Sequence, residues 1–138
     1  MEKQDMAQLT MPCKLEILKG YVFRQSNPAV VGVEVIVGKI KTDTPLIKQD
    51  GKDVGRLKSI QLEQENITEA EKGKQVAISI PDVTVGRQIN EGDILLSNIS
   101  EEEFRQLKKF KKYLNADEIE ILKQIAEIKR KTKPIWGV

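Results

Sequence analysis

Two lysines separated by one residue are the first side chains whose type and spacing suggest a binding chemistry. Lys39 and Lys41 lie in the segment Gly38-Lys39-Ile40-Lys41-Thr42-Asp43-Thr44-Pro45, where a strand is expected to run into a tight turn. Lysines at such a place can contact a phosphate backbone, and Arg24, Lys58 and Lys74 can extend a basic strip. The alternative is an ordinary solvated surface, and the residues alone leave both interpretations open.

The sequence lacks one residue type and one motif that commonly indicate an enzyme. The 138 residues include no histidine, which is the commonest general base and metal ligand. No Gly-x-x-x-x-Gly-Lys-Ser/Thr segment is present, so we expect no phosphate loop for nucleotide hydrolysis. Cys13 is the single cysteine, and its place on an expected strand predicts a small core residue. We predict no catalytic residue, no metal site and a chain that is not an enzyme.

The overall composition gives only general limits. Charged residues make up 32% of the chain and aromatic residues 4%, so the core must be aliphatic. The formal net charge is only +2, so nucleic-acid binding cannot be inferred from global charge and must rest on local patches. A lone cysteine excludes an internal disulfide and fits a reducing compartment. No apolar run approaches eighteen residues, and we expect a cytoplasmic location without a membrane contact.

A second candidate site lies in the C-terminal part, where isoleucines at helical spacing precede a basic tail. The apolar arc of the expected last helix is wide enough to form a groove in addition to a packing face. An extended peptide that mixes acidic and aliphatic residues would fit a groove of isoleucines rimmed by lysines. The alternatives are an arc fully covered by neighbouring elements and a basic tail that simply caps the helix. The residues of this candidate surface are Lys111, Lys112, Ile121, Ile125, Ile128, Lys129, Lys131 and Trp136, with Trp136 packing back across the helices.

These candidate sites are carried by a succession of short strands followed by two helices. Val31, Val33, Val35 and Val37 alternate with other residues and predict a strand with one buried face, preceded by a strand over residues 15–23. Asp-Gly at residues 50–51 predicts a hairpin. Further strands are expected over residues 54–62, with a bulge near Arg56, over residues 76–80 and over residues 94–99, with a charged loop over residues 66–74. This number of short strands favours a closed or nearly closed barrel.

The sequence pattern changes at Ser100, which begins a capping box with Glu103. The first helix is predicted to reach Leu114, and Asn115 caps a second helix that returns antiparallel to the first. The predicted fold is therefore mainly β: a small barrel over residues 12–99 with a C-terminal two-helix hairpin and tail over residues 100–138. Residues 1–11 are expected to be the end of a linker helix or a disordered start.

Several long strings of this sequence resemble one family of translation factors. They are Gly-Tyr-Val-Phe-Arg-Gln-Ser-Asn-Pro-Ala (20–29), Val-Gly-Lys-Ile-Lys-Thr-Asp-Thr-Pro-Leu (37–46), residues 83–96 and the closing Pro-Ile-Trp-Gly-Val. From about residue 12 to its end the chain resembles the last domain of archaeal and eukaryotic translation initiation factor 5B, the counterpart of bacterial initiation factor 2. The resemblance implies a barrel like the second domain of the elongation GTPases. It also implies an excised fragment without cofactors, because GTP and Mg belong to the absent GTPase domain.

The resemblance further implies two partners and a role in ribosomal subunit joining. In this family the last barrel receives the acceptor end of initiator methionyl-tRNA, and the corresponding residues here are Arg24, Lys39, Lys41, Thr42, Lys74, Gln75, Val76 and Ala77. Bacterial relatives carry Glu-Cys-Gly where this chain has residues 75–77, which favours an unformylated methionyl end. The added helices hold the acidic C-terminal tail of initiation factor 1A, and the ribosome is the wider partner.

Two classes of function therefore remain. The first is a non-enzymatic binding module with an RNA face on the barrel and a protein face on the helices. The second is a protein-interaction adaptor with no RNA contact, in which the lysines only make the surface soluble. Tyr21 and Phe23 bear on this choice, because a single-stranded acceptor end needs an aromatic platform, but as the only aromatic residues of the barrel they can equally belong to its core.

Overall fold

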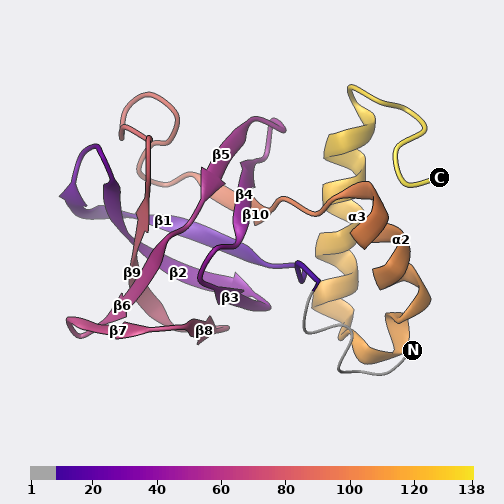
Figure 1. The fold of residues 1–138 in the computed structure, drawn as a ribbon, viewed down its shortest axis with the longest axis horizontal. Helices are drawn as coiled ribbons and strands as arrows, with labels where there is room; N and C mark the ends of the chain where they lie inside the picture. Colours follow the sequence, from indigo (N-terminus) through magenta and orange to yellow (C-terminus); the bar gives the residue numbers. More distant parts are fainter. Residues whose placement is uncertain (1–8) are drawn as a thin grey trace.

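The computed structural model describes residues 9–138 and consists of a β-barrel with two helices packed against its side (Figure 1). Eight strands form one antiparallel sheet in the order β5-β4-β10-β1-β2-β9-β6-β7, and β3 pairs with β8 in a separate two-stranded sheet. The strands are β1 (Lys14–Arg24), β2 (Ala29–Val37), β3 (Lys39–Lys41), β4 (Pro45–Lys48), β5 (Asp53–Arg56), β6 (Ser59–Leu62), β7 (Glu65–Ile67), β8 (Glu69–Glu71), β9 (Gln75–Ile80) and β10 (Ile94–Ser97).

The sheet curves into a barrel because one segment hydrogen-bonds to strands on both sides. The Leu57 N–H donates to the Thr44 carbonyl at 3.0 Å, beside β4, and the next residue, Lys58, donates to Ser79 of β9 at 2.8 Å. The chain thus passes from β5 to β6 between the two ends of the sheet, and Leu57 is fully buried there. The single strand expected over residues 54–62 is therefore wrong: it is two strands, with the change of pairing partner at residues 57–58.

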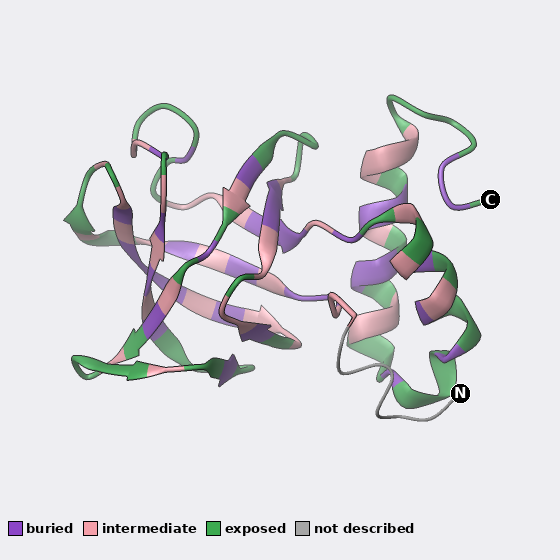
Figure 2. Ribbon diagram, in the orientation of Figure 1, coloured by how far each residue is buried: buried purple, intermediate pink, exposed green. Residues whose placement is uncertain are grey.

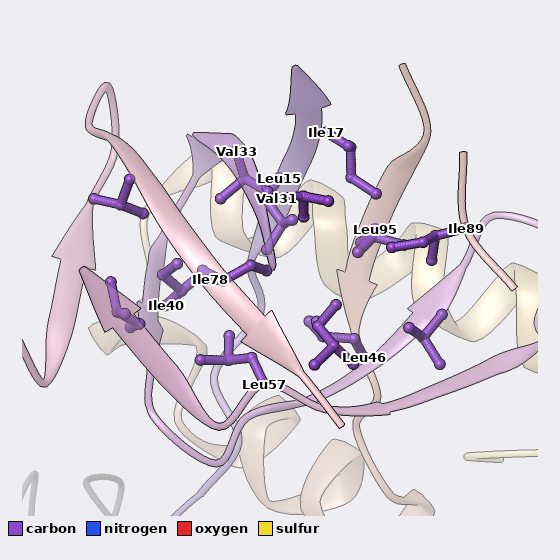
Figure 3. Close-up of a cluster of buried hydrophobic side chains, with 14 of the residues drawn as sticks. Leu15, Ile17, Val31, Val33, Ile40, Leu46, Leu57, Ile78, Ile89 and Leu95 are labelled. Atoms are coloured by element: carbon purple, nitrogen blue, oxygen red, sulfur yellow. The ribbon is translucent and has the colours of Figure 1, made fainter. Parts of the chain in front are cut away.

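The barrel core is aliphatic, as the composition predicts (Figure 3). Val31, Val33 and Val35 are fully buried in it, which confirms the alternating pattern of β2. Val37 continues the pattern but contacts a second cluster, made by the helices. Cys13 is a buried core residue, and burial raises the pKa of its thiol to about 11.

The predicted loop over residues 66–74 is wrong, because it contains most of β7 and all of β8. Ala70 of β8 stands opposite Ile40 of β3, and both side chains are buried in the barrel core. The charged residues on both sides of Ala70 hide this short strand in the sequence, since its only apolar residue is small. The hairpin at Gly51 and the strand over residues 76–80 are confirmed, whereas the last strand ends two residues early, at Ser97.

The helices are α2 (Glu101–Lys109) and α3 (Ala116–Arg130), joined by the short 3-10 helix η1 (Lys111–Tyr113). Both predicted capping boxes are present: Ser100 pairs reciprocally with Glu103, and Asn115 with Glu118. α2 ends at Lys109, with Phe110 as its C-cap, rather than at Leu114, because the chain tightens into η1 before α3 begins. Buried and exposed residues alternate along both helices (Figure 2), and the buried ones form the apolar face that joins the helical cluster.

Helices and barrel share one continuous interface. Successive residues of two strands serve different clusters: Leu46 of β4 and Leu95 of β10 enter the barrel core, while Ile47 and Leu96 enter the helical cluster. Ile47 and Leu96 stand opposite each other in the β4–β10 pair, so the helices rest on the outer face of these strands. The predicted hairpin packed on the barrel is confirmed.

The segment before β1 is anchored to both parts. The fully buried Ser97 hydroxyl accepts the Cys13 N–H at 3.1 Å and donates to the Met11 carbonyl at 2.8 Å, while the Thr10 N–H donates to Glu103 of α2 at 2.7 Å. Residues 1–8, to which the expected linker helix or disordered start largely belongs, lie outside the described residues. From residue 9 onward, no helix is both long and apolar enough to cross a membrane.

Candidate nucleic-acid interface

The outer face of the barrel carries a groove that an irregularity of β1 produces. Ile17 pairs with Val33 and Val22 pairs with Val31, so four residues of β1 stand opposite the single residue Gly32 of β2. A bulge of this kind lifts side chains away from the sheet. A second register shift follows at Phe23, between Val22 and the next paired residue. The two bulges together turn Tyr21 and Phe23 outwards.

Gly32 is required for this arrangement. A Cβ at this position would lie 2.8 Å from the Tyr21 Cβ, a separation that real Cβ atoms essentially never show. Without a side chain on Gly32, the Tyr21 side chain can lie directly across β2. The neighbouring position on β9 is Ala77, which pairs with Gly32, so two adjacent strands present only small residues to the groove. Gly32 and Ala77 therefore form the floor of the groove, and the larger Tyr21 side chain forms a wall above them.

The groove has a volume of about 520 Å³ and crosses four strands of the outer face. Tyr21 and Phe23 are 54% and 63% exposed, and their rings meet edge to face with centroids 6.4 Å apart. Exposed aromatic pairs of this kind offer a stacking surface to unpaired bases or to an apolar side chain. The residues that line this groove, hereafter the aromatic groove, are Leu18, Tyr21, Phe23, Val30, Gly32, Gln61, Glu63, Gln64, Gln75, Val76 and Ala77.

Polar side chains flank the floor of the aromatic groove, among them Gln61, which stands opposite Ala77 in the strand register. Gln75 donates its side-chain amide to Glu34 at 3.0 Å, which fixes both side chains beside the floor. On the opposite side, Glu63 and Gln64 form the tip of the β6–β7 hairpin with φ of +52° and +70°. Two successive positive φ angles are the backbone of a type I′ turn, which usually contains Asn or Gly. The groove wall thus combines an unusual turn with amide side chains that can donate to a ligand.

Of the eight predicted tRNA-binding residues, only Gln75, Val76 and Ala77 line this groove. Val76 points mainly into the barrel and is almost fully buried, so its contribution to the surface is small. Arg24 follows Phe23 at the end of β1, where its Nε donates to the Ser26 carbonyl at 3.1 Å. Lys74 is exposed and directly precedes Gln75.

The other three predicted tRNA-binding residues lie on the separate β3–β8 sheet and its turn. Lys39 makes an ion pair with Glu69 of β8 at 3.2 Å, and Lys41 stands opposite Glu69 in the strand register. Thr42 is half-buried, and its N–H donates to the Thr68 carbonyl at 3.0 Å. Since two glutamates of β8 face the two lysines of β3, this strip is largely charge-compensated and less able to attract phosphates than the sequence suggests.

The predicted isoleucine groove on the helices is wrong, because two of its three isoleucines are buried in the core. Ile121 and Ile125 are buried in the helical cluster, with Ile125 fully inaccessible, because α2 and the barrel cover the wide apolar arc of α3 together. Ile128 is half-buried and lies against the β4–β5 turn, where a Cβ on Gly51 would be 3.2 Å from its Cγ2. No continuous apolar trough remains for these three residues to line.

The four predicted rim lysines also do not surround one site. Lys111 and Lys112 precede α3, whereas Lys129 and Lys131 lie at its C-terminal end. At about 1.5 Å per residue, the fifteen residues of α3 separate the two pairs by roughly 22 Å. Lys129 is half-buried, donates to Asn98 and has its pKa lowered by desolvation, with Asp53 opposing the shift.

Trp136 packs back across the helices, as predicted. The centroid of its ring lies 4.8 Å from the centroid of the Phe104 ring, and the Trp136 side chain is buried. The neighbouring Gly137 has φ of +71° and leaves no room for a Cβ beside the same ring. Glu101 holds this tail, accepting the Gly137 N–H at 3.1 Å and the Lys133 Nζ at 3.0 Å. These hydrogen bonds, led by that of Gly137, lower the pKa of the Glu101 carboxyl.

Sequence reasoning left open whether Tyr21 and Phe23 belong to the core, and it did not identify Gly32 or the β6–β7 turn as parts of a site. One signal was present: Gly20 and Gly32 interrupt two otherwise β-branched and aromatic strands, and glycine in a strand often marks a bulge or a close approach. The turn at residues 63–64 had no such signal, because glutamate and glutamine do not predict positive φ.

The comparison with protein families defines the class of this domain. The family described as elongation factor Tu domain 4 matches residues 11–96, which includes nearly the whole barrel. The chain belongs to this family.

Individual relatives then point to one kind of factor within it. Two proteins, each named probable translation initiation factor IF-2, are 47% identical in Methanopyrus kandleri and 48% identical in Methanoregula boonei; each alignment covers 99% of this chain and 23% of the relative. A crystal structure of GDP-bound aIF5B from Aeropyrum pernix matches with a TM-score of 0.91 and 38% identity, over 97% of this chain and 23% of that one. The resemblance to initiation factors 2 and 5B is confirmed, and the chain spans about a quarter of these archaeal relatives.

Proposed function

We propose that this chain is a binding module of translation initiation that receives the acceptor end of initiator methionyl-tRNA in the aromatic groove. The observation that carries the proposal is the exposed pair Tyr21 and Phe23 above a floor of Gly32 and Ala77. Stacking on aromatic side chains is how proteins usually hold unpaired nucleotides, and each stacked base contributes roughly 1–3 kcal/mol. The names of its relatives support a role in initiation, and the resemblance to factors 2 and 5B implies a role in ribosomal subunit joining.

The chemistry of the aromatic groove favours the end of the tRNA over its phosphates. Glu63 and the Gln75–Glu34 pair stand at its sides, so no strong positive field points into it. A methionyl group is uncharged apart from its amino group, apolar and flexible, and it can fill the low floor over Gly32 and Ala77. The phosphates of the acceptor stem would then lie outside the groove, within reach of Arg24 or Lys74. An acidic rim also suits a free α-amino group better than a formylated one.

The test measures binding of an acceptor minihelix that ends in single-stranded CCA with methionine on a hydrolysis-resistant 3′-amide. Phe23→Ala is expected to weaken binding by about 5- to 150-fold, which corresponds to roughly 1–3 kcal/mol for one lost stacking contact. The matched control is Tyr113→Ala, which removes another exposed aromatic ring, located between the helices. Equal affinity of both variants and the unchanged chain would refute the aromatic groove as the acceptor site.

The competing proposal is a protein-interaction adaptor without RNA contact. A module that holds tRNA gives a log affinity that falls with log salt, whereas an adaptor shows no specific RNA binding at any salt concentration. The same minihelix titrated between low and moderate salt therefore separates the two. Under either proposal the chain is not an enzyme, GTP and Mg²⁺ are bound by a separate GTPase domain, and the location is the cytoplasm.

We further propose that the acidic tail of initiation factor 1A binds the helices, as the family resemblance implies, but at one end of α3 only. Lys131 and the 69% exposed Ile135 lie beyond the C-terminal end of α3, close in sequence to the half-buried Ile128 and Lys129. This end combines positive charge with exposed aliphatic surface.

A further inference from the structure

A second pocket opens on a different part of the barrel, between the β4–β5 hairpin and the loop over residues 84–89. It has a volume of about 250 Å³ and is lined by Lys48, Lys52, Asp53, Arg87 and Gln88. All five lining side chains are polar, and three carry a positive charge. Its strands, β4 and β5, are separated from the aromatic groove by β10 in the sheet order. We refer to it as the cationic pocket.

Backbone hydrogen bonds and buried side chains fix both segments that form the cationic pocket. In the hairpin, the Lys48 N–H donates to the Lys52 carbonyl at 3.0 Å, and Val54 anchors the strand in the core. In the loop, the Arg87 N–H donates to the Thr84 carbonyl at 3.0 Å, and buried Ile89 anchors the segment. The three cationic side chains therefore extend from backbone segments that are hydrogen-bonded and anchored in the core.

Gln88 adds a neutral donor to the same pocket. Its Oε1 accepts the Thr84 N–H at 2.9 Å, so its amide nitrogen is the group left to donate to a ligand. The pocket thus offers a guanidinium, two ammonium groups and one amide N–H₂. Donors in this number suit the several oxygens of a phosphate better than the two of one carboxylate.

The charge balance around the pocket is positive. Among residues 9–138 there are four ion pairs, and none of them involves Lys48, Lys52 or Arg87. The one acidic lining residue, Asp53, accepts the Gly55 N–H at 2.9 Å and interacts electrostatically with Lys129 of α3.

A second carboxylate lies at the tip of the β4–β5 hairpin, just outside the lining. Asp50 accepts the Lys52 N–H at 3.0 Å, a hydrogen bond that lowers the pKa of its carboxyl. Three cations of the lining and Lys129 therefore face two carboxylates, Asp50 and Asp53, which leaves two positive charges without a local partner.

We propose that the cationic pocket binds a backbone phosphate of RNA and gives this domain a second RNA contact, distinct from the aromatic groove. The partner is a double-stranded segment, because none of the five lining residues is aromatic and an unpaired base would find no ring on which to stack. Clusters of basic side chains can also hold an acidic peptide, but the number of donors in this pocket favours a phosphate over a carboxylate. The proposal goes beyond the acceptor-end function and does not depend on it.

The experiment uses a fluorescein-labelled 12-base-pair RNA duplex with blunt ends, which lacks the single-stranded end that the aromatic groove would bind. Fluorescence anisotropy gives the affinity at several salt concentrations. The variant carries Lys52→Glu and Arg87→Glu, and the control carries Lys109→Glu and Lys123→Glu, the same charge change on exposed helical positions. Circular dichroism confirms that both remain folded.

Reversing two of the cations that surround the phosphate is expected to weaken duplex binding about tenfold or more at low salt and to reduce the salt slope by about 1.5. The control is expected to keep the slope of the unchanged chain and to lose less than about threefold in affinity. Equal losses in both variants would show diffuse attraction and overturn the proposal. A defect of Phe23→Ala with the CCA minihelix leaves this duplex measurement unaffected, so the two proposals fail separately.

Two further probes identify the source of the phosphate. Inorganic phosphate titrated into the ¹⁵N-labelled chain is expected to shift the Arg87 and Lys52 amide resonances, and the duplex is expected to shift the same signals at much lower concentration. Shifts with inorganic phosphate alone would overturn RNA as the ligand. An octaglutamate peptide that shifts these signals at lower concentration than the duplex would overturn it as well, in favour of an acidic protein partner.

Discussion

Replacing Ile125 by alanine measures directly whether the apolar arc of α3 is core or binding surface. Ile125 is fully buried in the helical cluster between α2 and the barrel strands. The substitution removes three carbon atoms, and at about 0.8 kcal/mol for each buried methylene the lost transfer free energy is about 2.4 kcal/mol. A residual cavity adds to this, so we expect a loss of about 3–4 kcal/mol in the free energy of unfolding. Domains of this kind have only about 5–15 kcal/mol in total.

The assay is urea unfolding followed by far-ultraviolet circular dichroism and by the fluorescence of Trp136, the only tryptophan. Ile135→Ala is the matched control, because it makes the same chemical change at a position that is 69% exposed. The control is expected to change stability by no more than about 0.5 kcal/mol. A loss below about 1 kcal/mol for Ile125→Ala would mean that Ile125 is not packed as described, and the isoleucine groove would have to be reconsidered.

Two further predictions concern the C-terminal end of the helices. An acidic-aliphatic peptide with the sequence of an initiation factor 1A tail is expected to bind several-fold more weakly to Lys131→Glu than to Lys111→Glu, measured by calorimetry; equal weakening would contradict a site at one end of α3. The second concerns pH: because the pKa of Glu101 is lowered by the Gly137 N–H and by Lys133, its contribution to docking the tail is fully present above the unfolded-state pKa of about 4.3. It is lost as the pH falls through the lower folded-state value, so Trp136 emission is expected to shift to longer wavelength there. Glu101→Gln should remove that transition, and its persistence would assign the change to another carboxyl group.

Local patterns predicted the elements that local forces determine. The alternation in β2 follows from a buried face, and the two capping boxes follow from backbone N–H groups that need partners within three residues. The β3–β8 pair was missed because its three-residue strands are stabilised by contacts thirty residues apart, such as Ile40 with Ala70. A short stretch of sequence, from which a strand is normally predicted, does not include both partners.

The same distinction explains what was predicted of the sites. Lys39 looks like a free cation in the sequence, and only the fold brings Glu69 to it. The burial of Ile121 could not be decided from one helix, because two neighbouring elements cover its face. The aromatic groove depends on the register of β1 against Gly32, which two glycines hinted at and no local pattern specified.

The division of β4 and β10 between two clusters has a consequence for how these strands find their alignment. Leu46 and Leu95 face the barrel interior, while the adjacent Ile47 and Leu96 face the helices. In an antiparallel sheet, sliding a strand by one residue turns every side chain to the opposite face. Here such a slip would still bury apolar residues on both faces, so hydrophobicity alone would not oppose it.

Other features must then select the native alignment. The buried Ser97 is well placed to do so, because a slip would carry its hydroxyl to the other face and leave the Cys13 N–H and the Met11 carbonyl unpaired. The hydrogen bonds of Ser97 can therefore fix the register of β10, and with it the side chains that enter each of the two clusters.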